Sequence, residues 1–504
     1  MWQFEVPPGS TPIGYRALIE MLEIKDVLPH YRWSYLSSKW EKREILLDRQ
    51  NLTLHIYPNN YKIDRSIFGH LEFALKHEGI NLLIIKKVLQ KLTEADIASY
   101  ILKQPTSKYG RMIWFFYEFL LDKKIEEVPN LKKGSYFSLL DETEYYVAAG
   151  MRSSRHRVVN NLLGTIDFCP IVRRTILLKT FEEKKLDMRS KELAHRYNQE
   201  VLIRAMRYLY TKETLSSWEI EREKPDKGRL AKFTNLLEQI DKIGELSREV
   251  LVDLQREIVD PRFALAGYRD FQNYIGEEPN FNQLTIHYIA PKPEDVEQLM
   301  QGLLSSFKHS SECNPIITAA VLAFGLVLIH PFWDGNGRLH RLLIHYTLNR
   351  MGFTPNGLVF PVSAVILRAP RDYDAVLESF SKPLMELITD YNVNEVGELK
   401  VKQSTFELYQ FIDFTLFAEY LFLCIETTIK TDFEKELNFL SDYDAVKKQL
   451  KILIDMPDRQ IDLFIKCVHQ NGGTLSARKK DAYFSMLSDK EIAEMLEIVK
   501  KGRY

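Results

Sequence analysis

A long uncharged segment constrains the fold of this chain more than any other feature. No side chain other than His330 can carry charge between Asn314 and Trp333, and the residues up to Ile329 are almost all apolar. A helix that is apolar on every side has to be buried. The apolar part is shorter than the ~20 residues that a membrane-spanning helix needs. We therefore expect a helix in the centre of a globular core.

The composition is that of a folded chain with more than one domain. At 504 residues the chain exceeds a typical single core, which favours two or three domains. Its 45% hydrophobic and 27% charged residues exclude a disordered or fibrous protein. The formal net charge of -1 gives no overall field that would attract nucleic acid or a membrane surface. A nucleic-acid partner would need a local basic patch.

Cysteine usage and the first residues indicate a reducing compartment. The four cysteines are far apart and have no CxxC spacing, as expected of unpaired buried thiols. The segment MWQFEVPPGSTP contains an acid and prolines where a signal peptide has basic residues and an apolar run. We expect a soluble, cytoplasmic protein with no membrane partner.

Hydrophobic periodicity predicts a mainly α fold. Helical patterns occur in TPIGYRALIEMLEI, HLEFALKHEGINLLIIKKVLQKL and KKLDMRSKELAHRYNQEVLIRAMRYLY, and we expect the chain to be helical again from SSRHRVVNNLLG onward. Thr93 with Asp96, and Ser488 with Glu491, have the spacing of helix-capping pairs. LTLHIY is a candidate strand, and the alternating pattern within residues 271–290 predicts one small hairpin.

Three consecutive regions are expected along the chain. These are an N-terminal accessory region of mixed and helical structure at residues 1–165, a core domain at residues 166–390 and a C-terminal helical accessory region at residues 391–504. The polar segment YNVNEVGELK marks the last boundary. The final helical patterns resemble a helix-turn-helix or winged helix, but their basic cluster, residues 478–480, is short.

The turn after the uncharged segment, HPFWDGNGRLHR, concentrates residues suited to phosphate chemistry. Gly335, Asn336 and Gly337 can adopt backbone angles that point consecutive N–H groups into one concavity at the start of the next helix, which binds phosphate. Arg338 and Arg341 are three residues apart, so both lie on one helix face and can hold further phosphate oxygens. Two arginines suggest more than one phosphate.

Two further side chains complete this motif. Asp334 lies beside the glycines, where a carboxylate next to polyphosphate usually binds Mg²⁺. His330 titrates near neutral pH and can take a proton from an attacking hydroxyl, an effect worth about 10² to 10⁴ in rate. Phe332 is apolar between polar neighbours and is expected to anchor the turn in the core. The combination predicts transfer of a phosphate-containing group.

Simpler explanations exist for each residue alone. A histidine that ends a buried helix is more often structural than catalytic, and Gly-Asn-Gly is a common turn. His330, Asp334 and His340 could also be metal ligands. No cysteine or second carboxylate supports a metal site, however, and it would leave both arginines without a role.

The motif resembles the signature of Fic domains, HPFx(D/E)GNGRxxR, at every specified position. Fic domains share a mostly helical core, and most characterised members transfer AMP from ATP to a hydroxyl side chain of a target protein. Glycine at position 337 favours AMP transfer, since relatives that phosphorylate have lysine there. The resemblance implies the following roles: His330 as base, Asp334 as Mg²⁺ ligand, Asn336 at the α-phosphate, Gly335 and Gly337 in the anion hole, and Arg338 and Arg341 at the β- and γ-phosphates.

A second resemblance implies autoinhibition. In TLSSWEIEREKPDKG, Ser217 and Glu221 resemble the inhibitory helix (S/T)xxxE(G/N) of one Fic class, expected at about residues 213–223. Glu221 would pair with Arg341 and compete with the γ-phosphate for the same donors. The chain departs from that motif at Arg222, where Gly or Asn is expected.

The predicted hairpin resembles the flap over which an extended target segment binds in this family. The resemblance implies that ATP with Mg²⁺ and a target protein with a Ser, Thr or Tyr hydroxyl, the chain itself included, are the substrates. A homo-oligomer is compatible with the sequence. Tyr373 is a candidate for stacking on adenine, and core packing explains it equally well. The candidate flap residues are Thr285, Ile286, His287 and Tyr288.

Two other functions stay open at this point. The chain could transfer another phosphate-containing group, or remove AMP with Glu221 orienting water. It could also be a nucleotide-sensing regulator, including one associated with DNA. The intact His330 speaks against a sensor, because binding phosphate does not require a base. The near-neutral charge disfavours a nucleic-acid partner.

Overall fold

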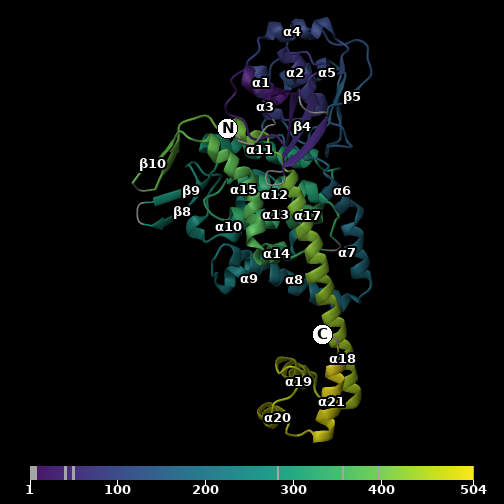
Figure 1. The fold of residues 1–504 in the computed structure, drawn as a ribbon. Helices are drawn as coiled ribbons and strands as arrows, with labels where there is room; N and C mark the ends of the chain where they lie inside the picture. The colour runs from purple at the N-terminus through teal and green to yellow at the C-terminus, as the bar shows by residue number, and fades with distance from the viewer. Residues whose placement is uncertain are drawn as a thin grey trace. The chain divides into compact units, whose positions relative to one another are not determined.

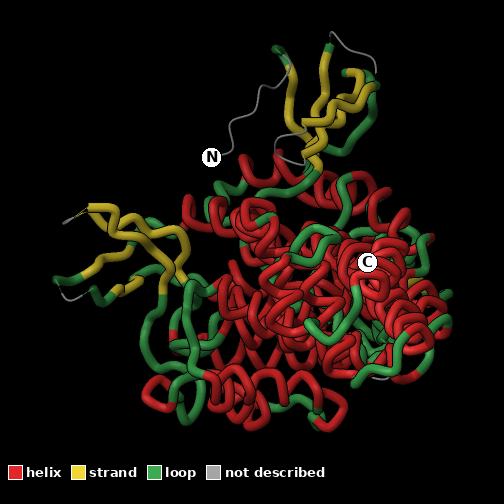
Figure 2. Tube along the Cα trace, turned by 90° about the horizontal axis from the view of Figure 1, so that it is seen from below, coloured by secondary structure: helices red, strands yellow, loops and turns green. Residues whose placement is uncertain are grey.

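The fold is mainly α, as expected (Figure 1). The computed structural model describes residues 8–38, 42–47, 52–280, 283–354, 357–395 and 397–502. Figure 2 shows the strands in small sheets beside the helices. None of the described helices is long and apolar enough to cross a membrane. The described α-helices up to the hairpin are α1 (Tyr15–Met21), α2 (Ile67–His77), α3 (Leu82–Gln90), α4 (Glu94–Lys103), α5 (Lys108–Leu121), α6 (Ile176–Glu183), α7 (Leu186–His195), α8 (Gln199–Ile220), α9 (Lys227–Glu238) and α10 (Arg248–Ile258).

The chain forms two compact units, and each is built from separated segments. The first unit contains Met1–Thr180, Asp241–Met351 and Ala369–Phe422, and the second contains Phe181–Ile240, Gly352–Arg368 and Leu423–Tyr504. The three consecutive regions expected from the sequence stay a prediction. The described α-helices after the hairpin are α11 (Pro293–His309), α12 (Pro315–Ile329), α13 (Asn336–Arg350), α14 (Val362–Arg368), α15 (Pro370–Leu387), α16 (Phe406–Gln410), α17 (Thr415–Thr428), α18 (Glu434–Leu453), α19 (Asp458–Gln470), α20 (Ala477–Tyr483) and α21 (Asp489–Lys501).

The first unit begins with a four-stranded sheet in the order β1-β2-β4-β3. Strands β2 and β4 are parallel, and the other pairs are antiparallel. The candidate strand LTLHIY is confirmed as part of β4, and the Thr93–Asp96 pair forms a capping box at the start of α4. The strands are β1 (Ser10–Ile13), β2 (Arg32–Ser37), β3 (Arg43–Leu47) and β4 (Leu52–Pro58).

The prediction of helical structure from SSRHRVVNNLLG onward is wrong for the first residues of this segment. This segment forms β6 (Met151–Ser153) and β7 (Val158–Asn160), which pair with β5 (Phe137–Ser138) in the order β5-β7-β6, and the next helix begins only at Ile176. Arg157 ends the turn with a positive φ of 53°, which a helix does not allow.

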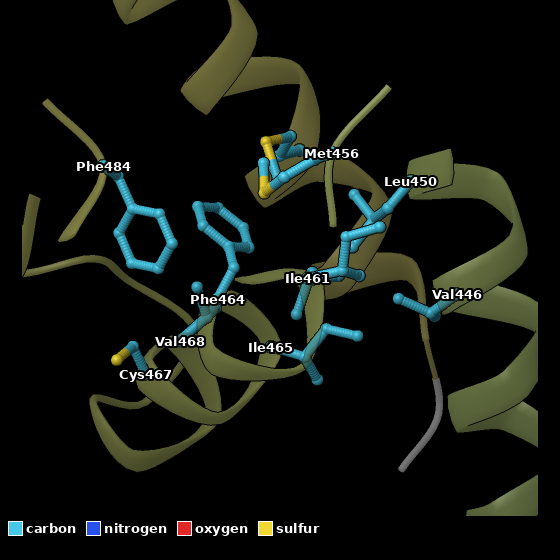
Figure 3. Close-up of a cluster of buried hydrophobic side chains, with 11 residues drawn as sticks. Val446, Leu450, Met456, Ile461, Phe464, Ile465, Cys467, Val468 and Phe484 are labelled. Carbon is cyan, nitrogen blue, oxygen red and sulfur yellow. The ribbon is translucent and has the colours of Figure 1, made fainter. Parts of the chain in front are cut away.

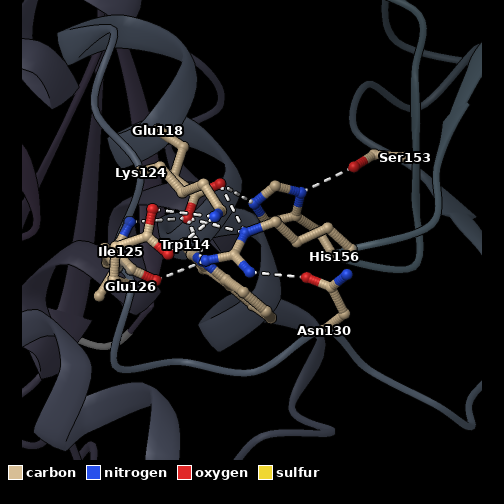
Figure 4. Close-up of polar contacts among 9 residues, drawn as sticks. Trp114, Glu118, Lys124, Ile125, Glu126, Asn130, Ser153 and His156 are labelled. Carbon is tan, nitrogen blue, oxygen red and sulfur yellow. Dashed lines mark hydrogen bonds and ion pairs between the residues drawn. The ribbon is translucent and has the colours of Figure 1, made fainter.

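A partly buried carboxylate, that of Glu118, holds this turn (Figure 4). Arg155 donates to both oxygens of Glu118 over 2.8 and 2.9 Å, His156 lies 3.0 Å from it, and Trp114 donates its Nε1 proton over 2.9 Å. Burial alone would raise the pKa of Glu118, but the hydrogen bonds from His156 and Arg155 outweigh it and hold the pKa at about 2. A long-range ion pair therefore decides the local structure.

Two other expectations differ from the structure. One hairpin was expected, but the polar segment YNVNEVGELK, expected to mark a boundary, contains a second antiparallel pair, β10 (Tyr391–Val393) with β11 (Leu399–Val401). The long amphipathic stretch at residues 184–210 is interrupted between α7 and α8, because Asn198 caps a new helix by accepting from Val201 N.

The central helix expected from the uncharged segment is confirmed as α12. Thirteen of its fifteen residues are buried. It packs against α11 and α13, so the motif turn joins two neighbouring core helices. Phe332 is fully buried, which confirms its predicted role as an anchor.

The second unit contains α8 and its packing partners. Asp432, in the π-helical turn Ile429–Phe433, is 2% exposed and accepts from Lys212 over 2.6 Å and from Arg368 over 2.8 Å. Glu213 of α8 accepts from the backbone N and Oγ of Ser363 over 2.9 and 2.6 Å. Charged and polar side chains thus tie α8 to α14 and to the start of α18.

The C-terminal helices of this unit share one apolar cluster (Figure 3). Leu450 of α18, Phe464 of α19 and Met495 of α21 are buried in it. The predicted Ser488–Glu491 capping box starts α21. On α20, Lys480 pairs with Asp489 and Lys479 donates to Gln470. Two of the three basic residues noted in the sequence, Lys479 and Lys480, therefore have partners within this unit.

Candidate functional site

The motif turn begins where α12 ends in a left-handed residue. His330 is the C-cap with φ 54° and ψ 58°, and its N–H donates to Leu326 O over 2.8 Å. Its Nδ1 lies 3.1 Å from Val327 O. Because a carbonyl oxygen only accepts, Nδ1 carries the proton, and Nε2 is the ring nitrogen that can take one.

Asn336 closes the turn. Its Nδ2 donates to Phe332 O over 2.8 Å, and its Oδ1 accepts from Phe332 N over 3.1 Å. The side chain is 2% exposed. The carboxamide is thus used within the turn, and its expected contact with an α-phosphate stays a prediction.

Gly335 is required by both backbone angle and space. It precedes α13 with φ 89°, in the left-handed region. A Cβ at this position would lie 2.6 Å from Cγ1 of Val259, the residue that follows α10. The N-terminus of α13 can therefore follow the turn directly only with glycine here. Gly335 is buried, and the half-buried Gly337 lies in the first turn of that helix.

Asp334 and Arg338 form an ion pair at the start of α13. Arg338 Nη2 donates to Asp334 Oδ1 over 2.6 Å, and Gly335 N donates to the same oxygen over 2.5 Å. The Asp334 side chain is 33% exposed, and its Oδ2 accepts no hydrogen bond from the described residues. Arg338 and Arg341 are both buried, and both lie in the first two turns of α13.

His340 and Tyr373 lie in an aromatic cluster inside the first unit. His340 packs on Phe324 with ring centroids 4.6 Å apart, and Tyr373 packs on His340 and on Tyr420 at 6.1 and 6.0 Å. Tyr373 is only 8% exposed. Core packing thus accounts for Tyr373, and its contact with adenine stays a prediction. The position of His340 among aromatic rings does not suit a metal ligand.

The predicted hairpin is present as β8 (Tyr274–Asn280) and β9 (Gln283–Ile289), with a register shift after Ile275. Residues 281 and 282, in its expected turn, lie outside the described residues. Thr285 and His287 are exposed and Ile286 is half-buried. Tyr288 is buried, and its hydroxyl donates to Leu328 O in α12. Three of the four candidate flap residues thus have exposed surface, and the fourth attaches the hairpin to the core.

An exposed aromatic group beside the motif was not anticipated. The Trp333 side chain is 52% exposed and packs edge-on against Phe263 and Phe271, with ring centroids 5.3 and 6.0 Å apart. Trp333 also lines a cavity of about 920 Å³ between the foot of the β8–β9 hairpin and the β10–β11 hairpin. Nothing in the sequence separates Trp333 from a core residue, because it directly follows the aromatic residue Phe332, which is buried.

The candidate inhibitory residues belong to the second unit. Ser217 is buried in the last turn of α8, and Glu221 is the C-cap of that helix. Arg222 then takes a positive φ of 56°. This left-handed position after a helix is where Gly or Asn is usual, which gives a physical reason for the residue expected there. The pairing of Glu221 with Arg341 of the first unit stays a prediction.

Two polar side chains that bond to backbone carbonyls near the motif, Arg269 and Gln272, were also not predicted from the sequence. Arg269 is 2% exposed, and all its hydrogen-bond partners are backbone carbonyls. Gln272 Nε2 donates to Ala290 O over 2.6 Å. A single arginine or glutamine in a loop has no pattern that sequence analysis could detect.

These features define a class of protein. A buried helix ends in a histidine whose Nδ1 bonds to a carbonyl oxygen. A tight turn with an ion-paired carboxylate and a glycine follows, and the next helix carries two buried arginines in its first two turns. This is a helical protein in which a histidine that could accept a proton lies beside a turn that could bind an anion.

Residues 245–348 match the Fic/DOC family, so this part of the chain is a Fic domain. The resemblance drawn from HPFWDGNGRLHR is confirmed. The protein adenylyltransferase Fic of Drosophila virilis is 34% identical over 116 residues, 22% of this chain and 22% of that protein. The protein of the same name from Nematostella vectensis is 34% identical over 122 residues, 23% of this chain and 26% of that protein. The chain therefore spans about a quarter or less of the curated relatives it matches.

Two solved structures are similar at low scores. A Fic domain containing signalling protein from Bacteroides thetaiotaomicron has a TM-score of 0.35 and 18% identity, and covers 51% of this chain and 94% of its own. A fragment of Fic-1 from C. elegans has a TM-score of 0.31 and 15% identity, and covers 82% of this chain and 97% of its own.

Proposed function

We propose that the protein transfers AMP from ATP to a Ser, Thr or Tyr hydroxyl of a target protein or of itself. The observation that carries this proposal is the tautomer of His330. With Nδ1 donating to Val327 O, the neutral ring presents Nε2 as a proton acceptor. The adenylyltransferase relatives over the same stretch support AMP as the transferred group.

In the proposed reaction, Nε2 of His330 takes the proton of the target hydroxyl as its oxygen attacks the α-phosphorus. The bond from phosphorus to the bridging oxygen breaks, and pyrophosphate leaves. N–H groups at the start of α13 stabilise the charge on the phosphate oxygens, since a helix N-terminus favours anions. Arg338 and Arg341 hold the β- and γ-phosphates.

The residues at the turn fit a magnesium ion. Asp334 is the carboxylate beside the anion-binding turn, and its Oδ2 is not engaged by the described residues. A single carboxylate completed by phosphate oxygens and water is a usual Mg²⁺ arrangement. When bound, the ion would neutralise phosphate charge. Asp334 would hold it while Arg338 keeps the other oxygen oriented.

Inhibition by Glu221 is part of the proposal. A carboxylate in the fork of Arg341 would compete with the γ-phosphate for the same donors. Ser217 and Glu221 lie in one helical turn, as the inhibitory motif requires. Arg222 has the left-handed backbone angle that Gly or Asn adopts readily after a helix, which supports the proposal despite the departure in sequence.

The flap residues Thr285, Ile286 and His287 are proposed to bind an extended target segment, because a two-stranded hairpin has open edges. Association with nucleic acid gains no support from α20, where the local basic residues have partners. A cytoplasmic location and a homo-oligomer remain proposals.

Labelled ATP tests the function. Wild type, His330→Ala, Glu221→Gly and the control His309→Ala, an exposed histidine on α11, are incubated with Mg²⁺ and ATP labelled at the α- or γ-phosphate, with and without cell lysate. Protein labelled from the α position only, most strongly in Glu221→Gly and absent in His330→Ala, supports AMP transfer. Label from the γ position makes the protein a kinase. No label from either, with ATP bound, points to another donor or to a sensor.

A further inference from the structure

Arg269 is a buried cation whose hydrogen bonds all go to backbone carbonyls. Nε donates to His330 O over 2.8 Å, Nη1 to Phe271 O over 2.7 Å and Nη2 to Pro291 O over 2.6 Å. Its backbone N–H donates to Pro331 O over 2.9 Å. No carboxylate of the described residues forms an ion pair with it, and burial lowers its pKa to about 10. The guanidinium therefore stays charged at neutral pH.

The carbonyls that Arg269 binds come from three places in the fold. His330 O, with Ile329 O at 3.5 Å, belongs to the end of α12. Phe271 precedes β8, and Pro291 follows β9. The last carbonyls of a helix lack partners within the helix and attract cations. Arg269 thus connects the residue that carries the base to both feet of the hairpin.

Other side chains join the same elements without touching His330. Gln272 donates to Ala290 O, Tyr288 donates to Leu328 O, and Tyr409 donates to Ile289 O over 2.5 Å. Of these, the Tyr288 contact reaches α12, two residues before His330, whereas Gln272 joins the feet of the hairpin to each other and Tyr409 joins β9 to α16. Arg269 is the described side chain that bonds both to the backbone of His330 and to the hairpin feet.

We propose that Arg269 is a positioning residue that fixes His330 relative to the β8–β9 flap. The inference rests on the proposed function, in which the flap presents the target hydroxyl and His330 removes its proton. A misplacement of about 1 Å between reacting groups can cost about 10²-fold in rate. Lysine cannot replace Arg269, because one ammonium lacks the fork that reaches carbonyls from three directions.

The experiment uses the full chain in the Glu221→Gly background and measures α-label transfer, ATP affinity and amide hydrogen exchange. Arg269→Lys is expected to lower kcat by about 10- to 100-fold, with the ATP Kd within about twofold of the parent. Exchange of amides at residues 274–289 and 330–332 should become faster. Arg269→Ala should recover part of its kcat in added guanidinium, which can enter the space that is left.

Arg256→Lys is the matched control. Arg256 is half exposed in α10, bonds Asp253 and Leu265 O, and touches neither His330 nor the hairpin. It should leave kcat and exchange unchanged.

Three results would overturn the proposal. These are an unchanged kcat in Arg269→Lys, a loss of ATP binding equal to the loss of rate, or faster exchange spread over the whole chain. If the Glu221→Gly parent transfers no label, the proposed function fails. The exchange of residues 274–289 and 330–332 still decides whether Arg269 links them.

Discussion

Asn336 and Phe332 exchange two hydrogen bonds across the motif turn, one through each polar atom of the asparagine side chain. Both partners are buried. Asn336→Ala would leave the N–H and C=O of Phe332 without partners, which costs about 1–3 kcal/mol each when buried. We expect a lower free energy of unfolding in urea and a loss of transfer activity. Asn235→Ala, at an exposed position in α9, should change neither, and equal effects in both variants would contradict the assignment.

Gly335→Ala should destabilise the turn for two separable reasons. The positive φ costs an L-residue about 1–2 kcal/mol, and the new Cβ would meet Cγ1 of Val259 at 2.6 Å. Val259→Ala removes the clashing methyl and leaves the backbone angle unchanged. A double-mutant cycle measured by urea unfolding should therefore give a favourable coupling that recovers only part of the loss. Full recovery would mean that the backbone angle has no cost.

Glu78 makes the N-terminal part of the first unit less stable as pH rises from about 4.5 to about 8. The carboxyl is fully buried and accepts from Tyr15 N over 2.7 Å. Burial raises its pKa from 4.5 to about 8. The folded chain thus holds this proton more tightly than the unfolded chain. Its contribution to stability is complete below about pH 4.5 and is lost as pH rises through 8.

Urea unfolding between pH 5 and 9 tests this dependence. The midpoint should fall with rising pH in the wild type. In Glu78→Gln, which cannot lose a proton, that part of the fall should be absent. The same slope in both variants would assign the pH dependence to other groups.

Arg222→Gly should stabilise the second unit. Glycine takes the left-handed angle after α8 without the steric cost that arginine bears, a gain of about 1 kcal/mol. Glu219→Gly, in the exposed last turn of the same helix, should instead lose about 1 kcal/mol. Thermal unfolding should thus shift in opposite directions for the two glycines. Transfer activity should fall in Arg222→Gly if the better-formed C-cap holds Glu221 in place.

Asp432→Asn should be strongly destabilising. The carboxylate is buried and accepts from Lys212 and Arg368, whose side chains are 27% and 45% exposed. Its removal therefore breaks charged hydrogen bonds at a buried acceptor, at a cost of about 1–3 kcal/mol. Asp444→Asn breaks an ion pair with Arg204 that is more than a third exposed on the acid's side. That exposed pair is worth about 0–1 kcal/mol. Similar losses in the two variants, measured by urea unfolding, would contradict the buried network.

The motif and the central helix were predictable because their signals are local. The uncharged segment fixes α12, and the signature fixes which residues occupy the turn after it. Strand content was not predictable where contacts distant in sequence decide it. The turn at Arg155–Arg157 is held by Glu118, and β10 and β11 are strands of only three residues around a polar turn, so the segment resembles a loop.

Within the site, residue identity was predictable but hydrogen bonding was not. The sequence alone does not distinguish an asparagine that binds phosphate from one that binds its own turn, as Asn336 does. Tyr373 was ambiguous for the same reason, since a buried ring in an aromatic cluster has the same local sequence as an exposed stacking platform. Arg269 was missed because its partners are carbonyls, which every residue has.

The discontinuous second unit has a consequence for synthesis on the ribosome. Lys212 in α8 bonds to Asp432, which leaves the ribosome 220 residues later. A helix whose partners are so far ahead in the chain folds with a high contact order, so its packing is delayed. The nascent chain therefore completes the motif turn before α8 acquires its charged anchor. A chain interrupted during translation would possess His330 and the motif turn before α8, which ends at Glu221, has gained its final support.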